Sequence, residues 1–170
     1  MDLKDFIRDV PDFPKPGILF RDITPLLRDA EALATTIDRL ADRAANWQAE
    51  VVAGIESRGF VFGTALAVHM GLGFVPIRKP GRLPCPTHRQ EYDLEYGQDA
   101  VEMHQDAVRP GQRVLMVDDL LATGGTMNAS CALIQRAGAV VAGCLFVIEL
   151  TGLNGRDRIP SYQATSLLSY

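Results

Sequence analysis

The sequence predicts an α/β fold in which a mostly parallel central sheet is flanked by helices. Short apolar runs rich in Val, Ile and Leu alternate along the chain with segments whose apolar residues repeat at helical spacing. Strands that alternate with helices usually form a parallel sheet with right-handed crossovers. The length of 170 residues is enough to bury a substantial core and fits a single domain, residues 1–170.

The first half of the chain is predicted to form a helix, a stiff loop, a second helix, a strand, a third helix and a second strand. The expected ranges are 2–9, 11–17, 26–47, 50–55, 59–70 and 74–77. The loop is stiffened by three prolines, which exclude regular structure there. In the long second helix, Leu33, Ile37 and Leu40 repeat at helical spacing, and Trp47 at its end is expected to pack in the core or at an interface.

The second half begins with a segment that breaks this alternation and then returns to it. Residues 80–105 are rich in proline and polar side chains, which indicates a long hairpin or lid outside the core. A strand, a helix that runs to Arg136, a longer strand, a charged loop and a short edge strand follow. The expected strands and loop are 114–117, 139–149, 152–160 and 164–168.

The strand at 114–117 leads into the strongest candidate for a binding site. Asp118 and Asp119 end the apolar run at what would be the carboxyl edge of the sheet, where open α/β sheets bind ligands. A short loop then opens the next helix, and its residues are Ala122, Thr123, Gly124, Gly125 and Thr126. Backbone N–H groups and the positive end of the helix dipole favour an anion there, while carboxylates can accept hydrogen bonds from ribose hydroxyls. The pattern therefore predicts a ligand with both a phosphate and a sugar; the alternative is an ordinary strand–helix turn with two solvated aspartates.

A second candidate anion loop follows the strand at 50–55. Glu56, Ser57, Arg58 and Gly59 lie between that strand and the next helix, so their amides can also face an anion. Arg58 in this loop and Lys79 after the next strand add positive charge that could neutralise an anion bound there. For both cations the alternative is a surface ion pair.

Taken together, the motifs resemble those of the adenine-using branch of the type I phosphoribosyltransferase family. They occur in the expected order from about residue 6 to residue 168, at 11–17, 20–23, 56–60, 78–79, 94–97 and 117–127. The resemblance implies the fold of that family, with a base-binding segment at about 1–28 and a flexible lid at about 80–105. It also implies a reaction of purine salvage: transfer of the phosphoribosyl group of 5-phospho-α-D-ribose 1-diphosphate to adenine, giving AMP and pyrophosphate.

The resemblance also implies roles for individual residues. The loop of residues 122–126 would bind the 5′-phosphate, and Asp118 and Asp119 would face the ribose. Residues 56–59, with a cis bond between Glu56 and Ser57, would bind the pyrophosphate, and Arg58 and Lys79 would neutralise it as it leaves and gains negative charge. Glu95 would transfer the purine proton and Tyr96 would help to close the lid. Leu19, Phe20 and Arg21 would bind adenine, mainly through the main chain. The alternatives are a solvated loop glutamate for Glu95 and a core anchor for Phe20.

The composition of the chain limits the kinds of partner that it can bind. The net charge of −4 disfavours nonspecific nucleic-acid binding, and no stretch has the basic start of a signal peptide or the length of a membrane span. Three cysteines without metal-ligand spacing indicate a reducing cytoplasm and no protein metal site. The resemblance implies Mg²⁺ carried by the substrate pyrophosphate and a homodimer.

Two alternatives to the predicted activity stay open at this point. One is a related transferase for hypoxanthine/guanine, xanthine or orotate. The other is a regulator that senses a purine or phosphoribosyl pyrophosphate without catalysis. Such a regulator should carry an added DNA-binding element and a basic face, and this short acidic chain shows neither.

Overall fold

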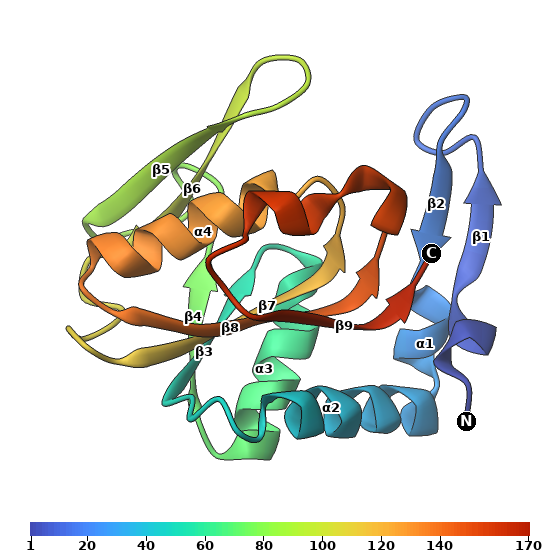
Figure 1. Ribbon diagram of the computed structural model, residues 1–170, viewed down its shortest axis with the longest axis horizontal. Coiled ribbons are helices and arrows are strands. Elements are labelled where there is room, and N and C mark those ends of the chain that lie inside the picture. The colour runs from blue at the N-terminus through green and yellow to red at the C-terminus, as the bar shows by residue number, and fades with distance from the viewer.

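The computed structural model describes all 170 residues and has a five-stranded parallel sheet at its centre (Figure 1). The strand order is β4-β3-β7-β8-β9, and every neighbouring pair is parallel. The strands are β3 (Val51–Ile55), β4 (Gly73–Ile77), β7 (Arg113–Leu121), β8 (Val140–Glu149) and β9 (Ala164–Ser169). The predicted α/β class with a parallel central sheet is confirmed.

Helices cover both faces of this sheet, as the alternating sequence requires (Figure 1). The helices are α1 (Thr24–Arg28), α2 (Ala30–Ala44), α3 (Arg58–Met70) and α4 (Gly125–Arg136). Val52 packs with α2 and α3 in one hydrophobic cluster, whereas the next residue, Ala53, packs with α4 in the other. Successive side chains of a strand point to opposite faces, so a strand buried on both faces has an unbroken apolar sequence.

Two antiparallel ribbons are attached to the central sheet. The first pairs β1 (Arg8–Pro11) with β2 (Leu19–Asp22), and the second pairs β5 (Thr87–Asp93) with β6 (Gln98–His104). The turns of both ribbons lie at the same side of the molecule, at the top of Figure 1. The second ribbon is the hairpin predicted for residues 80–105, but its predicted place outside the core is wrong: Val101 and Met103 of β6 are buried in the hydrophobic cluster that includes α4.

Two predicted elements near the N-terminus are wrong in detail. Residues 2–9 do not form one helix but a single 3-10 turn, η1 (Leu3–Phe6), followed by β1. Residues 8–11 instead pair with β2 as strand β1. This contact is non-local, so the local apolar spacing does not reveal it. The helix expected at 26–47 is interrupted at Asp29, whose side chain accepts a 2.9 Å hydrogen bond from the backbone N–H of Ala32 and starts α2.

Two later elements also differ from prediction. Strand β7 does not end at Asp118 but continues to Leu121, because Leu120 and Leu121 pair with β8. The charged loop expected at 152–160 contains two short 3-10 helices, η2 (Thr151–Leu153) and η3 (Gly155–Arg158).

The strand order determines where a ligand can bind. The chain leaves β3 through α3 toward β4 on one side, whereas β7 continues through α4 toward β8 on the other side. Because β3 and β7 are neighbours, the loops at their carboxyl ends diverge there, and such a switch point is where open α/β sheets bind ligands. None of the helices has both the length and the apolar character that a membrane crossing needs.

Candidate active site

The loop after β3 makes a sharp entry into α3. The Glu56–Ser57 peptide bond is cis, as the sequence resemblance implies, and α3 begins two residues later, at Arg58. The Glu56 carboxylate accepts hydrogen bonds from the backbone N–H of Lys79 at 2.9 Å and from Nε of Arg78 at 3.0 Å. Glu56 therefore ties this loop to the end of β4 and brings Lys79 to the same cleft.

The two aspartates of β7 lie directly beside this loop. Asp119 is only 4% exposed, and its Oδ2 lies 3.0 Å from Nε of Arg58 in an ion pair. That oxygen has no hydrogen-bond partner, so the contact is electrostatic and leaves Oδ2 able to accept one. Gly59 allows this approach, since a Cβ there would lie 2.9 Å from Oδ1 of Asp118.

The aspartate pair is electrostatically costly when both members are charged. Burial raises the pKa of the Asp118 carboxyl well above its ordinary value, and the neighbouring Asp119 charge raises it further. Burial also raises the pKa of Asp119, although the Arg58 guanidinium opposes this. A ligand that donates hydroxyl hydrogen bonds would satisfy carboxylates that the protein leaves incompletely paired.

The loop of residues 122–126 forms an anion cradle at the start of α4. Gly124 precedes the helix with φ +82°, and a Cβ at this position would overlap the carbonyl oxygen of Gly155. A cavity of about 80 Å³ is lined by the whole loop. The N-terminal amides of α4 and its dipole face that cavity, which is the arrangement that binds phosphate in many proteins.

The η3 segment supports this cradle from behind. Arg156 donates to both carboxylate oxygens of Glu149, from Nε at 2.7 Å and from Nη2 at 2.6 Å, and Ser166 donates to the same carboxylate at 2.6 Å. The hydrogen bond from Arg156 holds the pKa of Glu149 below its ordinary value. This network anchors Gly155 against Gly124, so the loop rests on a fixed backbone.

A cleft extends from the loop after β3 to Thr126 of the phosphate loop. Its volume is about 300 Å³. The lining residues are Ile55, Glu56, Ser57, Arg58, Lys79, Asp118, Asp119, Leu120 and Thr126. Residues predicted separately from two strands therefore line one cleft at the switch point, next to the phosphate cradle.

The hairpin contributes two residues that sequence reasoning did not select. Lys79 Nζ forms an ion pair with Asp99 of β6 and a 3.1 Å hydrogen bond with the hydroxyl of Tyr92 of β5. Oγ1 of Thr126 donates to the same hydroxyl at 3.1 Å. Tyr92 and Asp99 are direct partners across the ribbon, and a predicted hairpin register would have been needed to find them.

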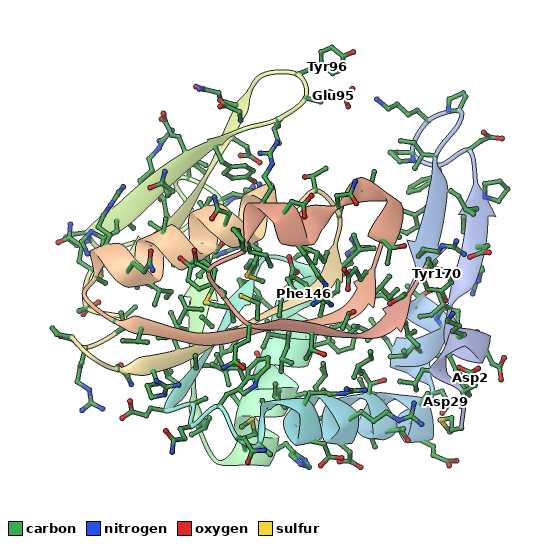
Figure 2. The ribbon with its side chains drawn as sticks, viewed as in Figure 1. Asp2, Asp29, Glu95, Tyr96, Phe146 and Tyr170 are labelled. Atoms are coloured by element: carbon green, nitrogen blue, oxygen red, sulfur yellow. The ribbon has the colours of Figure 1, made fainter.

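The proposed adenine-binding segment lies beside Arg58. Phe20 of β2 lies under its guanidinium, with 5.4 Å between the ring centre and Cζ. Arg21 pairs with Asp9, and its guanidinium stacks on the Tyr170 ring at 3.9 Å. Tyr170, which sequence reasoning did not select, therefore holds β2 from the other end of the chain (Figure 2).

Like Leu19, Phe20 and Arg21, the predicted lid residues Glu95 and Tyr96 do not line the cleft. Both lie at the tip of the β5–β6 hairpin, beyond the body of the molecule (Figure 2). Tyr96 is 85% exposed, and Glu95 is exposed as well. Their predicted roles need the hairpin to move.

The fold and the cleft define a class of protein, and comparison with known families agrees. The family model described as a phosphoribosyl transferase domain matches residues 20–166. Relatives called adenine phosphoribosyltransferase include those of Synechococcus sp., 58% identical over all of this chain and 99% of the relative, and of Thermosynechococcus vestitus, 57% identical over all of both chains. The chain belongs to the adenine phosphoribosyltransferase family.

Solved structures agree with the same assignment. The crystal structure of the adenine phosphoribosyltransferase of Thermoanaerobacter pseudethanolicus matches with a TM-score of 0.97 and 50% identity, covering 99% of this chain and 98% of that one. The Saccharomyces cerevisiae enzyme, crystallised with an imino-altritol bisphosphate and adenine, matches with a TM-score of 0.92 and 37% identity, covering 98% and 96%.

Proposed function

We propose that the chain transfers the phosphoribosyl group of 5-phospho-α-D-ribose 1-diphosphate to adenine, giving AMP and pyrophosphate in purine salvage. The observation that carries the proposal is a pair of adjoining cavities that share Asp118, Leu120 and Thr126 and bring together a cation-bearing loop, an acidic pair and a phosphate cradle at the sheet's switch point. The choice of adenine as the substrate rests on the relatives. They are called adenine phosphoribosyltransferase and are 54–58% identical over the whole chain.

The cradle and the acidic pair would hold the phosphoribosyl group. Amides of residues 122–126 bind the 5′-phosphate, and Asp118 and Asp119 accept hydrogen bonds from the ribose hydroxyls. The buried Oδ2 of Asp119, which is ion-paired with Arg58 but accepts no hydrogen bond, supports this role. Because these contacts are equal in the ground and transition states, they contribute mainly to affinity.

The loop of residues 56–59 would bind the pyrophosphate together with Arg58 and Lys79. As the C1–O bond breaks, the leaving pyrophosphate keeps the electron pair and gains charge, which positioned cations stabilise. In the cleft, Glu56 already accepts hydrogen bonds from Arg78 and Lys79, which follow β4, and Asp119 pairs with Arg58. No group of three or more His, Cys, Asp or Glu is arranged to hold a metal ion.

Mg²⁺ is proposed to arrive on the pyrophosphate of the substrate. Mg²⁺ keeps several waters and binds substrate phosphates in preference to all-protein cages. Bound to the pyrophosphate, it would supply further neutralisation of the leaving group.

Adenine would bind at Leu19, Phe20 and Arg21, next to Arg58. As C1 bonds to the purine ring nitrogen, that nitrogen loses its proton, and Glu95 accepts it. The hairpin tip must close over the cleft for this step, with Tyr96 helping to exclude water from the cation-like sugar. The exposed tip and the open cleft are consistent with such a movement.

We further propose a homodimer and a cytoplasmic location. Helix α3 leaves Val61 41% and Val68 77% exposed, an apolar face that a second copy could cover. Cys131 and Cys144 remain free thiols with their sulfurs 3.7 Å apart, which is consistent with a reducing compartment.

Steady-state assays with adenine, guanine, hypoxanthine, xanthine and orotate test the function. We expect AMP and pyrophosphate in equal amounts with adenine, and at least tenfold lower kcat/KM with each other base. Preferential turnover of another base would replace the substrate. Binding of phosphoribosyl pyrophosphate without turnover of any base would favour the non-catalytic regulator.

A further inference from the structure

Two side chains of the hairpin, Asp99 and Tyr92, contact protein groups that the proposed function assigns to binding of the anionic substrate. Asp99 forms an ion pair with Lys79 and accepts a 3.1 Å hydrogen bond from the Tyr92 hydroxyl. Lys79 and Thr126 both donate to that hydroxyl, each at 3.1 Å. The four polar groups form one network across the rim of the cleft.

The network uses donors that a bound pyrophosphate or phosphate would need. Lys79 and Thr126 line the cleft, and Thr126 also lines the phosphate cradle. Burial lowers the pKa of Lys79, but its hydrogen bonds to Asp99 and Tyr92 raise the pKa by more, so the lysine is fully charged and already neutralised by a carboxylate. A substrate phosphate and Asp99 therefore require the same cation.

The network also attaches the hairpin to the body of the molecule. Tyr92 is on β5 and Asp99 on β6, two strands whose tip carries Glu95. Lys79 follows β4 and Thr126 lies in α4, which belong to the central fold. If substrate takes Lys79 and Thr126, these contacts of the hairpin are lost.

We propose that Asp99 and Tyr92 are positioning residues that compete with the pyrophosphate group for Lys79 and Thr126. They hold the tip-side half of the hairpin in its open position until substrate displaces them, whereas Val101 and Met103 of β6 stay packed in the core. Binding of the anionic substrate therefore releases the tip and not the whole hairpin. This inference rests on the proposed function. It adds that Asp99 lowers the affinity for phosphoribosyl pyrophosphate.

The test measures dissociation constants of inorganic pyrophosphate, phosphoribosyl pyrophosphate and adenine by calorimetry for wild type and Asp99→Asn. We expect about 3- to 10-fold tighter binding of both anions and unchanged binding of adenine. Asp99→Glu, which restores the carboxylate, should return anion affinity toward the wild-type value. In steady state, Asp99→Asn should lower KM for phosphoribosyl pyrophosphate while kcat changes less than KM.

Asp93→Asn is the matched control, because it removes the same charge from the same hairpin. Asp93 accepts a 2.9 Å hydrogen bond from Gln98 and is not part of the network. Anion affinity should stay at the wild-type value in this variant. Equal tightening in both variants would show a general charge effect and overturn the proposal.

The outcomes also separate this inference from the proposed function. Unchanged or weaker anion binding by a folded Asp99→Asn variant would show that Asp99 does not compete for Lys79. A wild-type protein that binds neither anion would instead overturn the proposed function. Thermal unfolding of each variant verifies that the fold is retained.

Discussion

Glu95 is the residue whose proposed role depends most on movement. It is exposed at the hairpin tip, yet the reaction needs a base near the purine. Glu95→Gln should lower kcat by about 10²–10⁴-fold, the usual range for a lost proton transfer, while both substrate dissociation constants stay nearly unchanged. Single-turnover kinetics and calorimetry measure the two quantities. Glu91→Gln, on the same hairpin, is the control, and full kcat in Glu95→Gln would make Glu95 a solvated loop residue.

Asp118 illustrates a cost in stability that the site carries. Its pKa is raised in the folded protein by burial and by Asp119, so the folded state binds the proton more strongly than the unfolded chain. Stability from this group therefore falls as pH rises through the raised pKa. Asp118→Asn removes that cost and keeps an oxygen for the hydrogen bond from the Asp119 N–H.

We expect Asp118→Asn to be more stable than wild type at pH 7 by about 1 kcal/mol, or a few degrees in Tm. The advantage should shrink as the pH approaches 3.8, the ordinary pKa of the carboxyl. Affinity for phosphoribosyl pyrophosphate should fall by about 10- to 100-fold, since a charged hydrogen bond to the ribose is lost. Calorimetric melting between pH 4 and 8 and a binding titration check both parts. A lower Tm at pH 7 would contradict the electrostatic argument.

At the scale of elements, the phosphate loop depends on contact with η3. Gly124→Ala would combine a φ of +82° with overlap of the Gly155 carbonyl oxygen. We expect a loss of about 1–3 kcal/mol in stability and a higher KM for phosphoribosyl pyrophosphate, with little change in adenine binding. Denaturant unfolding and substrate titrations measure these effects.

Gly152→Ala is the matched control in the same region. A Cβ there meets nothing within 4 Å, so stability and KM should stay close to wild type. If Gly124→Ala behaves like this control, the loop does not need the support of Gly155.

The sequence predicted elements well where the information is local. The strand–loop–helix units at residues 51–70 and 113–136 could be found because apolar runs, glycines and charged residues lie next to each other in the chain. The β1–β2 ribbon, the contact of Tyr170 with Arg21, and the pairing of Asp99 with Lys79 were not predicted. These depend on segments far apart in sequence or on a hairpin register that no local pattern specifies. The individual roles of the site residues stay predictions.

At the scale of the whole molecule, the exposed face of α3 is the proposed dimer contact. Light scattering should give about twice the 18.6 kDa chain mass at working concentration. Val68→Glu, which places a charge on a residue that is 77% exposed, should shift the mass toward the monomer without loss of fold. A wild-type mass equal to one chain would exclude a stable dimer, and a dimeric Val68→Glu variant would place the contact elsewhere.

The cleft is built across the contact between β3 and β7, where Val51 pairs with Val114 and Gly54 with Val117. Two segments about sixty residues apart in the chain must therefore meet before one site can hold both the 5′-phosphate and the pyrophosphate of the substrate. A partly folded chain in which β7 has not yet joined β3 has no complete site, so substrate binds the native state and not that intermediate. Saturating phosphoribosyl pyrophosphate at 100 times its Kd would add about 2.7 kcal/mol to apparent stability, and most of this should appear as slower unfolding and slower amide exchange in both segments together.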